Sequence, residues 1–551
     1  MKTLNCLSIL LAMSLSAVFG QPVISSGGIR NAASNALDGL PNSGIAQGSY
    51  FTIYGSKLGP DIAAVYSGPL PYQKSLAGTS VKVTVSGTSV DAAIYFTGAN
   101  QINAILPSST PVGTGTLTVT YGQTSAPATI HVVATGFGIY TLNSNGAGPG
   151  IFSNFNSATD QPLNLPNSSA HPGQYVILWG NGLGPVNPVK EFDGPQPGDL
   201  KLPVQLWVGG KSATVTYAGR SGCCVAEDQI VFIVPNDVPL GCHVPVAVQV
   251  GNVVSNFATL AVAASGTTCS DAVSLSGDQI TKAQTAGSFT QGLITLNRIN
   301  AKVTVPLLGS LSVVSDQGTA SFGRYTAAQL LSVSYPVGFV STVGVCNVFT
   351  FQGTGVQFPT DAVQSTKLDG GTAINISGPN GAKQMTKQTG GGYSALLGGI
   401  DLNNPFGASS PGYLDPGSYT IDNGTGSTAV GPFKATVTLG QPVAWTNSTG
   451  ITNVDRTQPL KLTWSGGDPN GYVAAFGLSS TTNASVGFFC SAKPSDGSVT
   501  IPPAVLLSLP LSTGGYLGVL GASGNTPFTA TGIDSGAVVV TSTNAQTVAY
   551  Q

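Results

Sequence analysis

A stretch of thirteen residues that occurs twice constrains the fold of this chain more than any other feature. Residues 48–60 read GSYFTIYGSKLGP and residues 173–185 read GQYVILWGNGLGP, so the copies align without a gap at an offset of 125. The apolar and β-branched run favours a strand, and the glycines and the final proline favour a turn that ends strand pairing. No residue in the stretch is chemically reactive, so it indicates architecture and not activity.

A second match shows that the repeat extends over a whole domain. Residues 101–107 (QINAILP) return as residues 229–235 (QIVFIVP), at the nearly equal offset of 128. Two such offsets indicate a duplicated domain. Short strands broken by Gly, Pro, Asn and Ser are typical of an antiparallel sandwich. We therefore expect two sandwich domains, at residues 23–150 and 151–266.

The composition supports an all-β protein of several domains. The 551 residues exceed what one core usually holds, 41% are hydrophobic, and 73 are glycine. Only 8% are charged, against about a quarter in an average domain. The net charge of −2, with no Lys/Arg cluster, argues against nucleic acid or an anionic membrane as a partner.

The N-terminus is typical of a secretory signal. Residues 1–20 hold one lysine, a short apolar run and small residues ahead of Gln21. A membrane anchor is disfavoured because the run is short and no stop-transfer pattern follows. Cys6 precedes the apolar run and is badly placed for lipid attachment. We expect a secreted or cell-surface protein with no membrane span in the mature chain.

Six cysteines remain once the signal is removed, and an even number in an exported chain indicates disulfides. Metal binding is the disfavoured alternative, because the spacings match no zinc motif. Two of the cysteines lie in a seven-residue insertion of the second copy, and a third is also new there. We hypothesise that one of the first two pairs with the third and the other with the fourth, leaving the last two as a pair. In chain order they are Cys223, Cys224, Cys242, Cys269, Cys346 and Cys490.

The repeat motifs resemble a known domain family. Residues 148–152 (GPGIF), 217–219 (YAG) and 229–235, with the paired glycine turns, are similar to uncharacterised C-terminal domains of exported acidobacterial (Solibacter-type) proteins. Those domains are similar to IPT/TIG immunoglobulin-like domains. The resemblance covers about residues 23–266 and implies an Ig-like sandwich and an exported protein. It supplies no catalytic residues, and here the pair precedes a large further region.

The pattern changes beyond residue 270. We divide this region into β-rich segments at 270–360 and 441–551, packed together, around a sandwich-like segment at 361–440. The best helical candidate in the mature chain is Thr326–Leu331. If Cys346 pairs with Cys490, the whole region behaves as one composite unit.

Catalytic and metal-binding patterns are not evident. The three histidines lie in a strand, before a proline and beside a cysteine, and no Gly-x-Ser-x-Gly elbow occurs. The few carboxylates are scattered or lie in turns, where turn formation is their default role. These residues are His131, His171, His243, Glu227, Asp228, Asp415, Asp422 and Asp468.

Two weaker binding patterns also have structural explanations. Residues 422–424 and 468–471 offer oxygens in tight turns, but neither follows the spacing of a calcium loop. Stacking on sugars is the second pattern, yet three of the four tryptophans lie in strand-like runs, where core packing is favoured. The tryptophans are Trp179, Trp207, Trp445 and Trp464.

The sequence thus predicts an all-β chain, with tandem Ig-like β-sandwiches followed by a larger β-rich sandwich region. We expect a non-enzymatic structural, adhesion or binding protein, with no cofactor or metal and with an unknown protein or glycan partner. One alternative is a carbohydrate-binding accessory protein, which predicts a row of exposed Trp or Tyr. Another is a hydrolase with a site in residues 270–551, which predicts paired carboxylates or a His beside a Ser.

Overall fold

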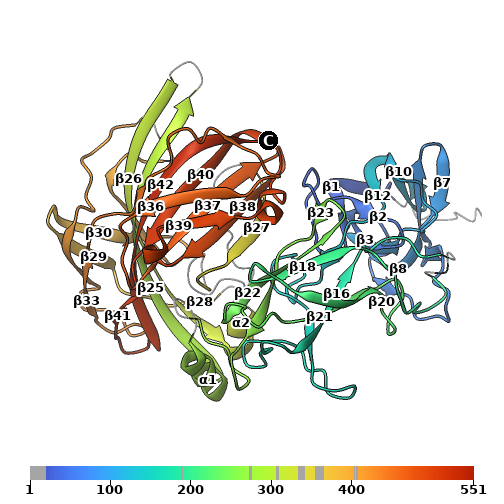
Figure 1. The fold of residues 1–551 in the computed structure, drawn as a ribbon, viewed down its shortest axis with the longest axis horizontal. Helices are drawn as coiled ribbons and strands as arrows, with labels where there is room; N and C mark the ends of the chain where they lie inside the picture. The colour runs from blue at the N-terminus through green and yellow to red at the C-terminus, as the bar shows by residue number, and fades with distance from the viewer. Residues whose placement is uncertain are drawn as a thin grey trace, which may run out of the picture.

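The computed structural model describes residues 20–187, 190, 192–271, 276–305, 309–332, 342–353, 365–402, 404 and 407–551. Two small β-sandwiches lie beside one larger β-rich region (Figure 1), so the all-β prediction is confirmed. Of the predicted signal segment, residues 1–19 lie outside the described residues. In the described part of the chain, every helix is too short or too polar to cross a membrane.

The first unit (residues 23–133) is a sandwich of two sheets. Its buried side chains alternate along the strands, as in β6, where Val81, Val83 and Val85 all point inward. One sheet has the order β1 (Val23–Asn31), β3 (Tyr50–Ser56), β9 (Gln101–Ile105), β8 (Ala93–Thr97), β4 (Ala64–Val65). The other has β2 (Ile45–Ala46), β12 (Ala128–Val133), β10 (Gly113–Tyr121), β6 (Thr79–Val85), β5 (Ser75–Leu76), with β7 (Thr88–Asp91) and β11 (Gln123–Thr124) beside it.

The second unit (residues 137–262) repeats this topology. One sheet has the order β13 (Gly138–Ile139), β16 (Tyr175–Asn181), β21 (Asp228–Ile233), β20 (Thr214–Arg220), β17 (Gly198–Asp199), and β15 (Phe152–Phe155) also pairs with β16. The other sheet has the order β14 (Gly148–Pro149), β24 (Ala258–Val262), β22 (Gly241–Val250), β18 (Val204–Val208), β19 (Lys211–Ser212), and β23 (Val253–Val254) also pairs with β22. The order β16-β21-β20 reproduces β3-β9-β8, and β24-β22-β18 reproduces β12-β10-β6. The duplication read from the sequence is therefore present in the strand order.

The start of the second unit differs from the predicted boundary at residue 150. β13 pairs with β16 and β14 with β24, so both strands belong to the second sandwich. The change of unit thus falls before residue 138. Strand patterns alone do not reveal which neighbour such a short strand will join.

The repeated turn keeps its backbone geometry in both copies. Gly48 and Gly173 begin the two stretches with φ of 70° and 81°, in the left-handed region that favours glycine. Lys57 stands where the second copy has Gly182, yet its φ is 55°. The turn is therefore kept even where its glycine is replaced.

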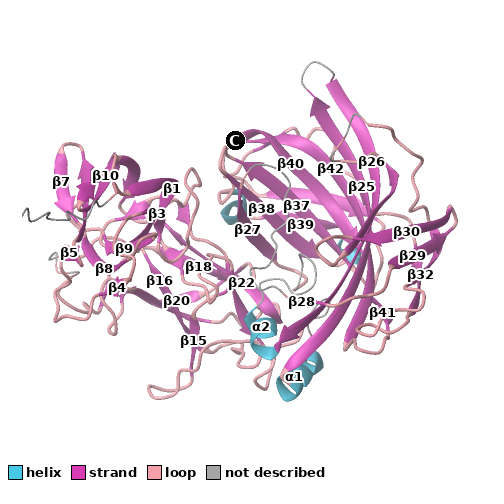
Figure 2. Ribbon diagram, turned by 180° about the vertical axis from the view of Figure 1, so that it is seen from behind, coloured by secondary structure: helices cyan, strands magenta, loops and turns pink. Residues whose placement is uncertain are grey.

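The third region (residues 276–551) is built on one large curved sheet (Figure 2). Its order is β27 (Cys346–Gln352), β38 (Ala484–Ala492), β37 (Tyr472–Ser480), β40 (Ser512–Ala522), β42 (Ser535–Tyr550), β25 (Ser288–Val305), β26 (Gly309–Thr326), β31 (Tyr393–Gly399), β30 (Gly381–Lys387), β29 (Ala373–Gly378), β32 (Gly417–Asp422), β33 (Lys434–Leu439). Short strands β28 (Thr366–Lys367), β35 (Asn453–Val454) and β41 (Thr526–Phe528) pair at its side, and β34 (Ala444–Trp445), β36 (Leu460–Ser465) and β39 (Ser498–Ile501) form a separate sheet. All three predicted segments beyond residue 270 contribute strands to the large sheet.

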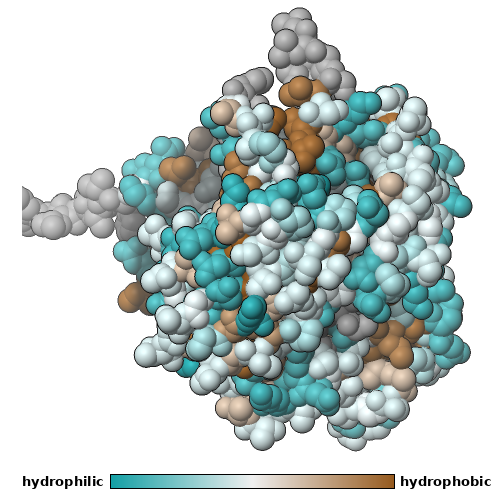
Figure 3. Space-filling view, turned by 90° about the vertical axis from the view of Figure 1, so that its left-hand side faces the viewer, coloured by the Kyte–Doolittle hydropathy of each residue, from teal (hydrophilic) through white to brown (hydrophobic). Residues whose placement is uncertain are grey.

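Two hydrophobic cores lie along this sheet. One contains Phe322 and Tyr419, and the other contains Phe488 and Leu517. Strand β42 runs through both, because it pairs in parallel with β25 and antiparallel with β40. The outer face of the region is mostly white and teal, with brown in a few patches (Figure 3), as expected for a chain rich in Ser, Thr and Gly.

Helices are few among the described residues, and two of the three α-helices were not predicted. Helix α2 (Ala327–Ser332) lies one residue beyond the predicted Thr326–Leu331, and α3 (Pro503–Leu506) is a single turn. The longest helix, α1 (Gly277–Ala286), begins with a capping box in which the Gln279 N–H donates to Ser276 Oγ over 3.3 Å. That Ser-x-x-Gln spacing was a readable helix start, but the following turns lack a clear apolar stripe.

We predict that Ile53→Ala lowers the protection free energy of β6 against hydrogen exchange by about 2–5 kcal/mol, the usual cost of a large cavity in a core. Ile53 is fully buried in the first unit. Hydrogen-exchange mass spectrometry of peptides covering residues 79–85 measures this change. Ile62→Ala is the matched control, because Ile62 is 89% exposed, and it should leave protection unchanged. Equal effects of the two substitutions would contradict the packing described here.

Candidate functional site at the junctions between units

The two copies of the repeated stretch face each other across the first junction. Asn181, from the second copy, accepts a hydrogen bond from the Tyr50 N–H of the first copy over 2.9 Å. Its Nδ2 donates to the Tyr50 carbonyl over 2.6 Å. The Asn181 side chain thus bonds both backbone groups of the first residue of β3 and connects that strand to the second unit. Asn181 is fully buried, so these bonds replace water and fix one arrangement of the two units.

A buried arginine locks the same junction. The Arg220 side chain is 2% exposed and forms an ion pair with Asp228, which is 0% exposed. Its Nη2 also donates to the Gly48 carbonyl over 3.0 Å and to the Gly184 carbonyl over 2.6 Å. The Asp228 Oδ2 accepts from the Leu183 N–H over 2.7 Å. One guanidinium therefore holds the start of the first repeat, the end of the second and the base of the inserted loop.

The inserted loop itself carries an unexpected disulfide. Cys223 bonds to Cys224, its neighbour in sequence, and the predicted bonds from these residues to Cys242 and Cys269 are wrong. The reason is position: the loop joins β20 to β21 at the first junction, whereas Cys242 lies at the start of β22. In the described part of the chain this loop also holds the one group of three potential metal ligands, formed by the two cysteines and Glu227. Both sulfurs are tied in the disulfide, so neither is a thiolate ligand.

Glu227 stands in an environment that disfavours its charge. Burial, and secondarily the negative charge of Asp228, raise the pKa of Glu227 to about 7. Its Oε2 lies 3.3 Å from the Cys223 Sγ. The inserted loop therefore contains a carboxyl that changes its charge near neutral pH.

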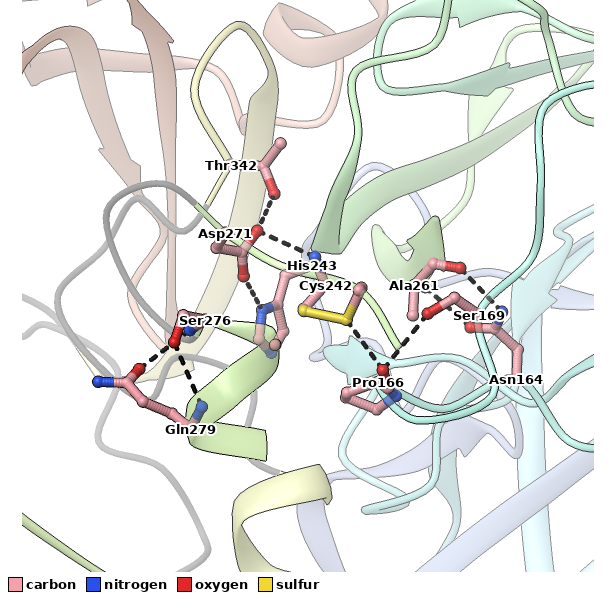
Figure 4. The surroundings of a disulfide bond; sticks show 12 residues. Asn164, Pro166, Ser169, Cys242, His243, Ala261, Asp271, Ser276, Gln279 and Thr342 are labelled. Atoms are coloured by element: carbon pink, nitrogen blue, oxygen red, sulfur yellow. Dashed lines mark hydrogen bonds and ion pairs between the residues drawn. A yellow bond between two sulfur atoms is a disulfide. The ribbon is translucent and has the colours of Figure 1, made fainter. Parts of the chain in front are cut away.

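The second junction is closed by the Cys242–Cys269 disulfide (Figure 4). Because Gly241 pairs with Val262, Cys242 lies beside the end of β24, and the chain needs only a few residues to bring Cys269 back to it. The Cys269 N–H donates to the Pro166 carbonyl over 2.9 Å. The disulfide and this hydrogen bond together fix the end of the second unit, where the third region begins.

The Asp271 carboxylate accepts hydrogen bonds from residues on both sides of this junction (Figure 4). Its Oδ1 accepts from the Cys242 N–H and from Thr342 Oγ1, each over 2.9 Å. Its Oδ2 lies 3.2 Å from His243 Nδ1, and a carboxylate only accepts, so that nitrogen carries a hydrogen. The three side chains are buried, so His243 has a structural role at this boundary.

The third disulfide joins Cys346 to Cys490, as predicted. The two cysteines are directly opposed in the β27–β38 pair, at one edge of the large sheet. The bond therefore ties the edge strand to its neighbour across 144 residues of sequence.

The other residues with potential chemistry have structural partners. His131 bonds to Thr114 Oγ1 over 3.1 Å, and His171 Nδ1 lies 3.0 Å from the Ala263 carbonyl. The Asp422 and Asp468 carboxylates each accept the N–H two residues on, at 2.9 Å, which is turn chemistry. Paired carboxylates, as a hydrolase requires, do meet in the third region, but both are bound to one arginine. Arg298 donates to Asp316 over 2.7 Å and to Asp415 over 3.1 Å.

The four tryptophans do not form an exposed row. Trp464 is buried in a core of the third region, and Trp207 and Trp445 pack against the same core. Trp179 is half-buried and donates to Ser153 Oγ over 3.3 Å. Core packing was the favoured interpretation for the tryptophans in strand-like runs, and it is confirmed for Trp207 and Trp464 but not for Trp179.

The three units meet around a cavity of about 200 Å³. The first unit contributes β1 and the loop after it, the second unit contributes residues 145–147 and 255–257, and the third region contributes the edge strand β27 and part of β38. Leu40 and Phe257 beside it belong to the same core as Val348, so the N-terminal pair packs firmly on the third region. Sequence reasoning missed this site, because its lining comes from segments more than 300 residues apart.

Comparison with known proteins gives only remote likenesses. No family model matches the sequence, and no curated protein matches it. Among solved structures, domains 5–6 of the S-layer protein SbsC are 16% identical, with 44% of this chain and 98% of that chain covered and a TM-score of 0.17. SGBP-B of the Bacteroides ovatus mixed-linkage glucan utilization locus, solved with a mixed-linkage heptasaccharide, is 12% identical over 77% of this chain and 88% of that chain, with a TM-score of 0.12. A 1.5-MDa bacterial ice-binding adhesin is 11% identical over 70% and 96%, with a TM-score of 0.12.

These likenesses are too remote to bear on function. The fold class therefore rests on the sheets of the chain itself.

We predict that Arg220→Ala destabilises the first junction by about 3–5 kcal/mol, because it leaves Asp228 buried without its counter-charge. Hydrogen exchange in residues 48–58 and 181–186 measures the loss. Lys211→Ala is the control: its ion pair with Asp237 is exposed, at 44% and 69%, and should contribute at most about 1 kcal/mol. Protection that survives Arg220→Ala would show that the clamp is dispensable.

The raised pKa of Glu227 predicts a pH-dependent effect of Glu227→Gln. A carboxyl whose folded pKa exceeds its unfolded value binds more protons when folded, so the wild type loses stability as the pH rises from about 4.5 to about 7. Glutamine mimics the protonated form and avoids this loss. The melting temperature of the variant relative to wild type should therefore be higher at pH 8 than at pH 5. Asp237→Asn, at an exposed site, should show no such rise, and an equal difference at both pH values would refute the assignment.

Proposed function

We propose that this chain is an exported protein of the bacterial cell surface or its surroundings, with a structural, adhesive or binding role and no catalytic one. The observation that carries the proposal is the pairing of all six cysteines beyond the signal segment into disulfides. Disulfides form and persist in oxidising compartments. One of them closes the exit of the second unit, and another ties the edge strand β27 of the large sheet to its neighbour.

The arrangement of the units supports a binding or scaffold role. Their junctions are formed by buried hydrogen bonds and a shared core, so the chain presents fixed surfaces. The histidines and the meeting carboxylates described above are engaged in structural contacts. Membership of the acidobacterial family related to IPT/TIG domains is part of this proposal and agrees with the duplicated sandwich.

Fractionation of a Gram-negative host that expresses the full chain tests the proposal. We expect the protein outside the cytoplasm, with an N-terminus at Gln21 and no thiol that reacts with iodoacetamide before reduction. A version lacking residues 2–20 is the matched control, and it should stay in the cytoplasm with reactive thiols. Retention of the full chain in the cytoplasm with free cysteines would overturn the proposal.

A further inference from the structure

The cavity where the three units meet contains an arginine without a counter-ion. Arg30 is the one charged side chain among the described residues that line it. Its Nε donates to the Gly27 carbonyl over 3.0 Å, and Nη1 lies 3.4 Å from Asn35 Oδ1. Across the described part of the chain, no carboxylate lies within ion-pair distance of Arg30; the exposed Asp38 in the following loop is not paired with it.

A half-buried, unpaired guanidinium favours binding of an anion. Its guanidinium carbon stands 5.4 Å from the Tyr54 ring centre, and burial lowers the pKa of Arg30 because water is excluded from the charge. An arginine keeps its charge nonetheless, and its planar fork matches a carboxylate with two parallel hydrogen bonds. A single arginine suits a singly charged carboxylate better than a phosphate dianion.

The remaining lining supplies the groups that recognise a sugar. Asn42, Asn145 and Gln352 bring amides, each with both donors and acceptors, which complement neighbouring hydroxyls. Val348, Thr350 and Gln352 share the face of β27 that lines the cavity, whereas the Phe351 ring stacks on Phe349 at 6.1 Å on the opposite face. The volume of about 200 Å³ lies below the roughly 300–1,000 Å³ of sites for drug-sized ligands, so the occupant has the size of one sugar unit.

We propose that this cavity binds a terminal uronic acid residue of a glycan. Arg30 would pair with the carboxylate, and the amides would bond the ring hydroxyls. A glycan is favoured over a peptide C-terminus because several amides surround a single cation, and because the described lining offers no second charge for a peptide to use. The inference rests on the proposed function, since such glycans are met outside the cell.

Isothermal titration of the mature full chain with galacturonate, trigalacturonate and galactose tests the proposal. We expect saturable binding of both acidic sugars, with galactose at least tenfold weaker. Arg30→Gln should weaken trigalacturonate binding at least tenfold and remove the preference over galactose. Arg324→Gln, at an exposed arginine of the third region, is the matched control and should bind as wild type.

A second variant keeps the test decisive if Arg30→Gln does not fold. Gln352 is exposed at the cavity, so Gln352→Ala should fold normally and weaken trigalacturonate binding severalfold. Equal binding of galactose and galacturonate, unchanged binding in both variants, or no binding at millimolar sugar would overturn the proposal. Tighter binding of N-acetyl-dialanine than of galacturonate would also overturn it and assign the cavity to peptide carboxylates. Each of these outcomes leaves the fractionation result untouched, so a failure here is distinct from a failure of the proposed function.

Discussion

The arrangement of the N-terminal half depends on one buried guanidinium. Arg220, at the end of β20 where the inserted loop begins, reaches to the carbonyls of Gly48 and Gly184, which belong to the two copies of the repeated stretch, while Asp228 balances its charge. Removing either partner leaves the other charge buried and unpaired, which is far more costly than losing an exposed ion pair. The insertion that makes the second copy different from the first is therefore the part that joins the two.

A buried polar network also holds the second junction. There a disulfide and the Asp271 network hold the exit of the second unit, and apolar side chains from both N-terminal units complete a core of the third region. Because each junction is desolvated, relative motion of the units would break hydrogen bonds between buried polar groups, which is costly. Fixed junctions in turn give the cavity between the units a defined shape, which a binding site assembled from three units requires.

The sequence predicted what depends on local pattern and missed what depends on the meeting of distant segments. Alternation and the repeated turn identified the sandwiches, and the leftover pair Cys346–Cys490 was right because opposed strands bring the two together. The predicted bonds from Cys223 and Cys224 to Cys242 and Cys269 were wrong, because shared absence from the first copy says nothing about which end of the sandwich a loop occupies. The sequence did not single out Arg30, because one arginine in a strand forms no recognisable motif. Its lack of a counter-ion becomes visible only in the structure, where three units surround it.

The central claim is that the three units form one rigid body held at its junctions. Double electron–electron resonance between spin labels at Ser86→Cys in the first unit and Ser409→Cys in the third region tests it most directly, since both positions are exposed. The account predicts a single narrow distance distribution centred on the separation in the structure. A broad or multi-peaked distribution in the intact protein would show that the units move independently, and would contradict both the clamp and the shared cavity.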